Sequence, residues 1–223
     1  MRLIGSFRSG ILSLRAERGY RERLVTLVTV LLAVGILPTP SSAFDPEQTF
    51  HKGAVLLSVE GGGGVETKIR ENVPISDIEF WNVGIRLSVI PFGTTGSGVL
   101  HNALYGALEL GLEPWFQQYT HPSNAYWAGL ALVGRYHFLG LGRVVPWVEW
   151  VGAAGGTDLK VPEIRSQFAF MTDIGVGASV FLTDRTALYI GYRLQHISNG
   201  NTSSPNYGFE SHTGVIGATF FLK

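Results

Sequence analysis

The feature that most constrains the fold is an alternation of bulky apolar residues with small or charged ones, which recurs in eight segments of the chain. In a β-strand successive side chains point to opposite faces, so a period of two predicts strands. Connections rich in Gly, Asn, Ser, Thr and Pro separate the segments, and we interpret the glycine run 61–64 as one such loop tip. The predicted strands cover residues 53–62, 78–90, 103–116, 125–138, 145–155, 167–181, 186–198 and 210–222.

The residues on the two faces indicate which β architecture these strands form. In segment 78–90, Val83, Ile85 and Leu87 share one face, whereas Gly84 and Arg86 lie on the other. A soluble β-sandwich places its bulk inside and its charge outside. Here the non-apolar face carries too few charges and too many Gly and Ala residues for a water-facing surface. It suits the crowded interior of a small barrel whose apolar face contacts lipid.

The charged and aromatic residues fit the same architecture. We expect the arginines to pair with acidic residues inside the barrel, and the tryptophans to supply aromatic girdles at the membrane interfaces. The sequence therefore predicts an all-β fold, an eight-stranded antiparallel transmembrane β-barrel of the outer membrane. The expected interior residues are Arg86, Arg135 and Arg193 with Glu109, Glu113, Glu149 and Asp173, and the girdle candidates are Trp81, Trp115, Trp127, Trp147 and Trp150.

The first 43 residues have the layout of a secretory signal. Six arginines precede an apolar run at residues 24–37, and small residues lead up to Ala43. The run falls short of the roughly 20 residues that a spanning helix needs. We expect cleavage after Ala43, which leaves residues 44–223 as a single β-barrel domain exported to the outer membrane of a Gram-negative bacterium.

Composition narrows the function further. Removing the leader's six arginines and two glutamates from the 17 basic and 17 acidic residues leaves 11 and 15, so nucleic-acid binding is disfavoured. The chain has no cysteine, which excludes disulfides and thiolate metal sites. We expect no metal and no cofactor, and we interpret the scattered histidines His51, His101, His121 and His137 as surface or interface residues.

Three polar residues near the C-terminus stand out because they fall on an apolar face. His196 and Ser198 continue the stripe of segment 186–198, and Glu210 begins the last strand on its apolar face. With a periplasmic N-terminus the seventh strand ends at the cell surface, so residues 199–209 form an extracellular loop. Ionisable residues on a lipid-facing stripe are costly unless they lie at the rim or serve a function.

The spacing of these residues suits nucleophilic catalysis. Strand geometry separates the Cα atoms of His196 and Ser198 by roughly 6.6 Å. If Glu210 lies opposite His196, their Cβ atoms are about 5 Å apart. Ser198 would then attack, His196 would carry the proton, and Glu210 would orient the imidazole. His212 shares the face of His196 and is a rival base, although a polar position at the headgroup level explains it as well.

The loop after Ser198 supplies candidates for an oxyanion hole. The reaction requires hydrogen-bond donors aimed at the developing oxyanion. Within the connecting loop we consider Asn206, Asn199 and backbone amides near Gly208 as substrate-binding or oxyanion candidates.

The run Tyr192-Arg193-Leu194-Gln195-His196-Ile197-Ser198-Asn199, with Pro205-Asn206 and then Glu210, resembles the C-terminal signature of PagL-type lipid A 3-O-deacylases, the acyloxyacyl hydrolase family. The resemblance covers about the last 30 residues, and the terminal Lys223 departs from the aromatic common in outer-membrane barrels. It implies an outer-membrane esterase that removes the 3-hydroxyacyl chain from the 3 position of lipid A. It also implies catalytic positions at His196, Ser198 and Glu210, an oxyanion residue at Asn206, and lipopolysaccharide as substrate.

Other functions remain open on the sequence alone. A non-enzymatic small outer-membrane barrel, structural or adhesive, would share the fold. So would an outer-membrane phospholipase, because the sequence does not separate an ester on glucosamine from one on glycerol. A soluble lipid-carrying barrel is a further alternative, and a homodimer is also open.

Overall fold

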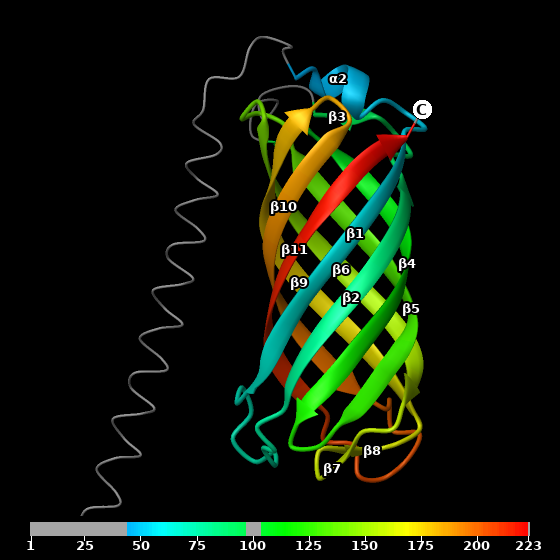
Figure 1. Ribbon diagram of the computed structural model, residues 1–223, viewed down its shortest axis with the longest axis vertical. Helices are drawn as coiled ribbons and strands as arrows, with labels where there is room; N and C mark the ends of the chain where they lie inside the picture. Colours follow the sequence, from blue (N-terminus) through cyan, green and yellow to red (C-terminus); the bar gives the residue numbers. More distant parts are fainter. Residues whose placement is uncertain (1–43, 97–103, 223) are drawn as a thin grey trace, which may run out of the picture. The chain divides into compact units, whose positions relative to one another are not determined.

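The computed structural model describes residues 44–96 and 104–222; the expected leader, residues 1–43, lies outside this part. Eight long antiparallel strands form a closed barrel (Figure 1). Each pairs with its neighbours along the chain, and the first also pairs with the last, which confirms the predicted fold class. The long strands are β1 (Val55–Thr67), β2 (Glu79–Val89), β4 (Gly106–His121), β5 (Ala125–Phe138), β6 (Val144–Thr157), β9 (Phe168–Thr183), β10 (Thr186–Ser198) and β11 (Phe209–Leu222).

The two ends of the barrel differ. One end, here called the loop end, carries the connections 68–78, 122–124, 158–167 and 199–208, and its third connection contains a small hairpin of β7 (Lys160–Val161) and β8 (Ile164–Arg165). The other, the plug end, carries β3 (Thr94–Thr95) and the helix α2 (Pro46–Thr49), as Figure 1 shows. No helix in residues 44–96 and 104–222 is long and apolar enough to cross a membrane.

The segment at α2 closes the plug end. Asp45 caps the helix by accepting hydrogen bonds from the backbone N–H groups of the next turn. Phe50 follows the helix, is fully buried, and packs against the rings of His137, Phe181 and Phe221 at centroid distances of 5.0, 5.7 and 5.1 Å. An apolar cluster therefore fills the barrel interior at this end.

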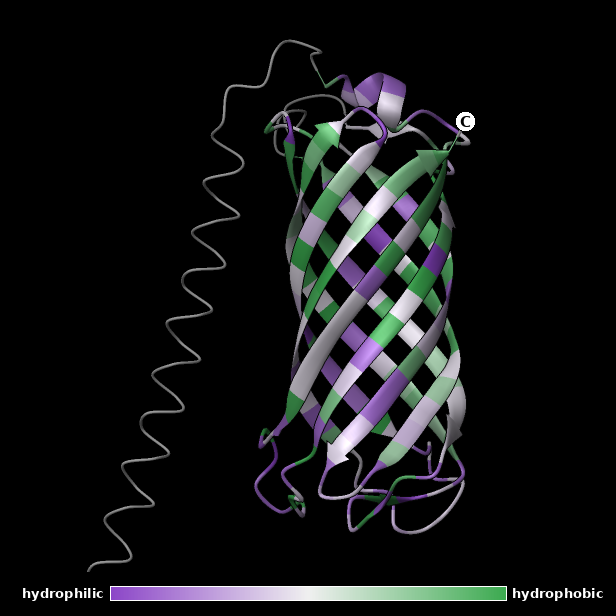
Figure 2. Ribbon diagram, in the orientation of Figure 1, coloured by the Kyte–Doolittle hydropathy of each residue, from purple (hydrophilic) through white to green (hydrophobic). Residues whose placement is uncertain are grey.

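The strands alternate between lipid-facing and interior residues, as the sequence predicted. Along β2 every second residue is buried, while Val83, Ile85 and Leu87 are about half exposed. Figure 2 shows the same alternation of hydrophobic and hydrophilic residues along the other strands. The outward apolar surface extends around the barrel, far beyond the patches that soluble monomers expose, so it is the surface that lipid covers.

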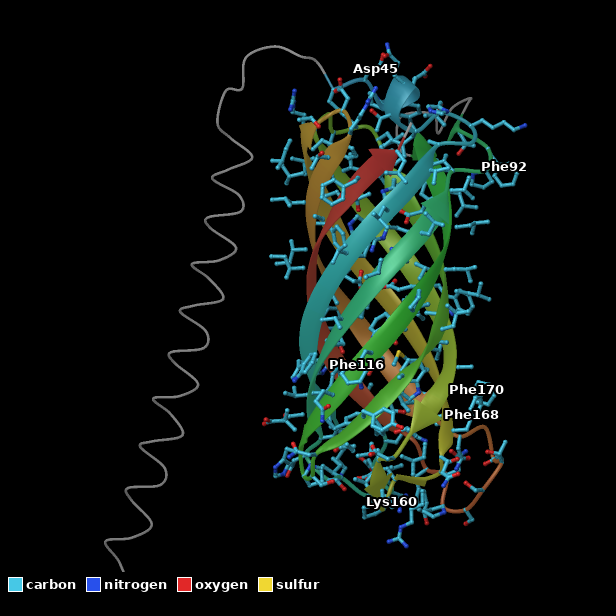
Figure 3. The ribbon with its side chains drawn as sticks, turned by 45° about the vertical axis from the view of Figure 1, so that its right-hand side comes forward. Asp45, Phe92, Phe116, Lys160, Phe168 and Phe170 are labelled. Carbon is cyan, nitrogen blue, oxygen red and sulfur yellow. The ribbon has the colours of Figure 1, made fainter. Side chains whose placement is uncertain are left out.

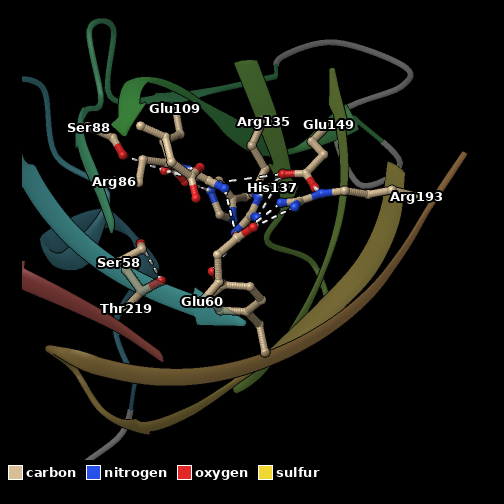
Figure 4. A network of polar contacts seen from close by, with 12 residues as sticks. Ser58, Glu60, Arg86, Ser88, Glu109, Arg135, His137, Glu149, Arg193 and Thr219 are labelled. Atoms are coloured by element: carbon tan, nitrogen blue, oxygen red, sulfur yellow. Dashed lines mark hydrogen bonds and ion pairs between the residues drawn. The ribbon is translucent and has the colours of Figure 1, made fainter. Parts of the chain in front are cut away.

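A network of charged side chains fills the middle of the barrel (Figure 4). Arg86 lies 2.8 Å from Glu113 and 2.9 Å from Glu60, and Glu149 lies 2.7 Å from Arg135 and 2.6 Å from Arg193. These side chains are inaccessible to solvent, and buried charges are tolerated when they are paired in this way.

The network departs from the prediction at two residues. The predicted partners Glu109, Glu113 and Glu149 all take part. Glu60, which was not predicted, joins them from β1 and contacts two arginines. Asp173 is buried but forms no salt bridge within the described residues. A strand's parity places a side chain inside the barrel, but the register between strands selects its partner.

The prediction that Gly61–Gly64 form a loop tip was wrong. All four lie inside β1 and pair with β11 on one side and β2 on the other. A Cβ at Gly64 would lie 2.7 Å from both the His212 carbonyl oxygen and Thr213 Oγ1. The glycines therefore allow neighbouring atoms to approach closely within the sheet.

Three of the five predicted girdle tryptophans face inward instead. Trp115, Trp127 and Trp147 are buried, whereas Trp81 and Trp150 are exposed on the outer face. The guanidinium of Arg135 lies 4.1 Å from the ring centroid of Trp147 and that of Arg193 lies 4.9 Å from Trp115. Trp115 and Trp147 thus cover the charged network with aromatic surface.

The interpretation of His137 as a surface residue was also wrong. It is buried in the barrel, and its Nε2 lies 2.8 Å from Glu109 Oε2. His51 and His121 are exposed, as expected, and His101 lies outside the described residues. His137 is two residues from Arg135 on β5, so the alternation of the strand predicts that it faces the interior.

Candidate active site

His196, Ser198 and Glu210 lie together on the outer face of the barrel, where β10 and β11 reach the loop end. His196 stands directly opposite Glu210 in the register, and Ser198 is the last residue of β10. All three are partly exposed, whereas the alternate residues Gln195, Ile197 and Phe209 are buried inside. The period of two thus gathers three chemically active side chains on the lipid-facing surface.

The imidazole of His196 is held by the carboxylate of Glu210. Nδ1 lies 3.1 Å from Glu210 Oε1, and the two side chains are 37% and 14% exposed. A carboxylate that accepts from Nδ1–H selects the tautomer whose Nε2 is free to take a proton. The pair therefore has the geometry of a general base with its orienting group.

Ser198 lies beside this imidazole, and both side chains lie close to the backbone at Gly208. A Cβ at Gly208 would lie 3.0 Å from His196 Cε1 and 3.1 Å from Ser198 Cβ, so both side chains approach one position. No hydrogen bond joins Ser198 to His196 within the described part of the chain. Catalytic hydrogen bonds are often long before substrate binds and tighten in the complex.

Arg70 also belongs to this cluster, although no motif or spacing in the sequence predicts it. Its Nη2 lies 2.9 Å from Glu210 Oε1 and donates a hydrogen bond of 2.7 Å to the Tyr207 carbonyl. Arg70 follows β1, whose last residue Thr67 pairs with Glu210. The cation therefore holds the carboxylate and the end of the 199–208 loop together.

The predicted oxyanion candidates Asn199 and Asn206 bond to each other within the loop. The Asn199 backbone N–H donates to Asn206 Oδ1 at 2.7 Å, and Asn199 Nδ2 donates to Ser203 Oγ at 2.9 Å. Asn206 Nδ2 donates in turn to Asn201 Oδ1 at 2.9 Å. These contacts order the loop that begins directly after Ser198.

Glu163, in the turn of the β7–β8 hairpin, connects three loops at this end. Its carbonyl oxygen accepts from the backbone N–H groups of Tyr207 and Gly208 at 2.9 and 3.0 Å. Its buried carboxylate accepts from Ser76 Oγ at 2.8 Å, in the loop that carries Arg70. The hairpin thus positions Gly208 against His196 and Ser198, and it engages the Gly208 N–H that we considered as an oxyanion donor.

The rival base His212 does not join the cluster, because its Nδ1 lies 2.5 Å from the Tyr192 hydroxyl. The neighbouring Ser211 faces the interior, where its hydroxyl bonds to Gln195. In residues 44–96 and 104–222 no group of three or more His, Cys, Asp or Glu side chains is arranged to hold a metal ion.

Comparison with known proteins identifies the family. A model of the family "Lipid A 3-O-deacylase (PagL)" matches residues 93–219, more than half of the chain. The chain belongs to this family. The match contains β10, the connecting loop and most of β11, and therefore His196, Ser198 and Glu210, whereas Arg70 precedes it. No curated protein matches the chain significantly.

Solved structures agree on the fold. The crystal structure of the outer membrane enzyme PagL is 17% identical, with 72% of this chain and 97% of that chain covered at a TM-score of 0.54. Neisserial surface protein A is 15% identical, with 77% and 100% covered at a TM-score of 0.51. PagL family membership together with this fold supports an outer-membrane lipid A deacylase in a Gram-negative bacterium.

Proposed function

We propose that this PagL-family protein hydrolyses the ester bond of the 3-hydroxyacyl chain at the 3 position of lipid A. Ser198 is the nucleophile, His196 the general base and Glu210 the group that orients it. The observation that carries the proposal is the contact between His196 Nδ1 and Glu210 Oε1, beside Ser198 on the lipid-facing side of the barrel. An ester hydrolase whose substrate stays in the membrane needs its nucleophile on that side.

The proposed reaction has two stages. Ser198 Oγ attacks the ester carbonyl carbon while its proton passes to His196 Nε2. The tetrahedral intermediate collapses, and the sugar oxygen leaves with the proton from His196. Water then attacks the acyl-serine, again with His196 as base, and releases a 3-hydroxy fatty acid and the free serine. Glu210 stabilises the imidazolium in both stages, and Arg70 holds Glu210 in place.

The oxyanion hole is proposed to lie in the 199–208 loop. Asn199, Asn206 and Gly208 are its candidates, because the loop follows Ser198 and returns beside it at Gly208. The Gly208 N–H would have to exchange its bond to the Glu163 carbonyl for one to the developing oxyanion. Donors aimed at that position supply a large share of the rate enhancement in acyl transfer.

We propose that the reaction takes place in the outer leaflet of the outer membrane. Export with cleavage after Ala43 would leave residues 44–223 as the mature barrel, with the plug end in the periplasm and the loop end at the cell surface. The cluster of His196, Ser198 and Glu210 would then lie at the level of the headgroups. The ester bonds of lipid A lie near the same boundary.

Mass spectrometry of lipid A from cells that express the wild type or Ser198→Ala tests the proposal. We expect the wild type to remove one 3-hydroxyacyl chain and Ser198→Ala to lower the rate by at least about 10³-fold. Ser204→Ala, which removes an exposed hydroxyl from the same loop, is the matched control and should behave as wild type.

Two results would overturn the proposal. One is deacylation by Ser198→Ala at the wild-type rate. The other is unchanged lipid A in cells whose outer membrane contains the folded, heat-modifiable wild-type barrel. In that case, mass spectrometry of the glycerophospholipids in the same extract distinguishes the alternatives. A phospholipase would have cleaved them, whereas a non-catalytic barrel would leave them intact.

A further inference from the structure

The β7–β8 hairpin at the loop end presents two cations side by side. Lys160 stands directly opposite Arg165 in the register, and Val161 stands opposite Ile164. Val161 and Ile164 are buried, so the alternate residues Lys160 and Arg165 project to the exposed face of the hairpin. Figure 3 shows Lys160 at the tip of the loop end.

This arrangement is unfavourable unless an anion joins it. Like charges directly opposite each other on two strands are destabilising, since their Cβ atoms are about 5 Å apart. Neither Lys160 nor Arg165 forms a salt bridge with a carboxylate in the part of the chain that the structure describes. Asp158 lines the same surface cleft as Lys160 and Arg165, but its Oδ1 accepts a 2.7 Å hydrogen bond from the Tyr126 backbone N–H.

The two cations border a cleft of about 700 Å³. Ser166 and Gln167 also line it, so a hydroxyl and an amide donor lie beside the lysine and the arginine. Guanidinium and ammonium groups with neighbouring donors are the usual partners of phosphate oxygens. With two cations against one carboxylate, the cleft has the charge and the donors to bind a phosphate group.

The cleft is connected to the proposed active site. Ser203 Oγ donates to the Arg165 carbonyl at 3.1 Å and also bonds to Asn199 Nδ2, next to Ser198. Ser198 pairs with Phe170 on β9, and Phe168 pairs with Gly156 on β6 at the edge of the cleft. Two strand spacings, about 10 Å, therefore separate Ser198 from the cleft around the rim.

Apolar surface lies between the two. Phe168 and Phe170 are 42% and 44% exposed. Figure 3 shows their side chains projecting outward from the barrel. Rings at this position contact acyl chains, while the cations beyond them face the headgroup level. A ligand that spans both surfaces must combine an anionic headgroup with several acyl chains.

We propose that the cleft at Lys160 and Arg165 is a subsite for a phosphate group of the glycolipid whose ester bond lies at Ser198. This assignment rests on the proposed function. The phosphate fixes the headgroup at the hairpin, and the acyl chains cross Phe168 and Phe170. The scissile ester then lies about 10 Å from the phosphate, beside Ser198 on β10. The subsite selects phosphorylated glycolipids over neutral ones.

Kinetics with two substrates test the subsite. The full-length protein in detergent micelles is given phosphorylated lipid A or the same lipid after removal of its phosphates. For the double variant Lys160→Gln/Arg165→Gln we expect kcat/KM on the phosphorylated lipid to fall about tenfold, mainly through KM, because two charge-assisted contacts are lost. The dephosphorylated lipid should be hydrolysed equally by the variant and the wild type.

Lys52→Gln is the matched control, because it removes an exposed cation from the plug end. It should leave both substrates unaffected. An equal rate for the double variant and the wild type on phosphorylated lipid A would overturn the subsite. If the wild type hydrolyses neither lipid, the proposed function fails, and the subsite is tested by binding instead.

The binding measurement uses vesicles that contain phosphorylated or dephosphorylated lipid A, with Ser198→Ala as the parent protein. Loss of the preference for phosphorylated vesicles when Lys160→Gln/Arg165→Gln is added supports the subsite, and an unchanged preference overturns it. Inorganic phosphate is the competitor. If inorganic phosphate releases the parent protein from the vesicles as effectively as added phosphorylated lipid A does, the cleft binds free phosphate. The assignment to a lipid is then overturned.

Discussion

Within residues 44–96 and 104–222, serine, histidine and glutamate side chains lie together at two places, one inside the barrel and one on its rim. Inside, Glu109 lies 2.8 Å from His137 Nε2 and accepts a 2.6 Å hydrogen bond from Ser88. On the rim, His196 lies 3.1 Å from Glu210, with Ser198 next to it. The side chains of the inner histidine and glutamate are only 5% and 1% exposed, against 37% and 14% on the rim.

The two sets differ in order as well as in access. In the inner set the glutamate is central, so Ser88 is bonded to a carboxylate and not to the imidazole. Phe50 packs against the His137 ring and closes the nearby end of the barrel. On the rim the histidine is central, as nucleophile activation requires. Residue types and short distances therefore do not define a site unless order and access agree.

Paired histidine variants give the sharpest test of this contrast, with the largest expected effect. We expect His196→Gln to lower kcat/KM for lipid A about 10³-fold, because the general base is lost. His137→Gln should leave kcat/KM unchanged but lower the free energy of unfolding by about 1–3 kcal/mol, since Glu109 loses a buried partner. Kinetics and urea unfolding in micelles measure both, and an equal loss of activity in the two variants would remove the distinction.

Gly208→Ala tests whether the rim set depends on close approach. Gly208 has φ of +64°, and a Cβ there would lie 2.7 Å from the Ile197 carbonyl oxygen. The loop must move away from His196 and Ser198, and a displacement of about 1 Å costs about 10²-fold in rate. Gly142→Ala is the control, because Gly142 has φ of +65° but its Cβ would meet no atom within 4 Å. Similar thermal stability with a rate loss in Gly208→Ala alone is the expected outcome.

Arg70→Gln is expected to have the smallest effect. The Arg70 side chain is 43% exposed, so its ion pair with Glu210 is screened and worth about 1 kcal/mol or less, or up to about fivefold in kcat. Lys68→Gln removes an exposed charge from the same loop and should leave kcat unaltered. Added salt should slow the wild type and not Arg70→Gln. A loss as large as that of His196→Gln would instead make Arg70 part of the chemistry.

Alternation along single strands accounts for most of what the sequence predicted about the fold. It gave the barrel, the lipid-facing surface and the arginines of the interior. The same parity places Trp115 and Trp147 beside Glu113 and Glu149 in the interior, whereas the general preference of tryptophan for membrane interfaces predicts the outer face. The prediction of a loop at Gly61–Gly64 was wrong because the role of these glycines depends on how closely backbone and side-chain atoms of β2 and β11 approach them.

The candidate site was predictable to the extent that it is local. His196 and Ser198 share a strand, and Glu210 is reached through one short loop, so period and spacing brought them together. Arg70 and Glu163 come from the connections after β1 and within the β7–β8 hairpin. Their contacts depend on how the barrel closes and how its loops pack, which no pattern within one segment encodes.

The pairing of Thr67 with Glu210 joins the first strand to the last. Arg70 can therefore reach Glu210 only after the final hydrogen-bonded seam of the barrel has formed. Before that seam forms, His196, Ser198 and Glu210 can already lie together on the β10–β11 hairpin, but the Arg70 contact is missing. Time-resolved refolding into micelles should therefore show a final rise in the rate of hydrolysis, by up to about fivefold, that coincides with seam closure and is absent in Arg70→Gln.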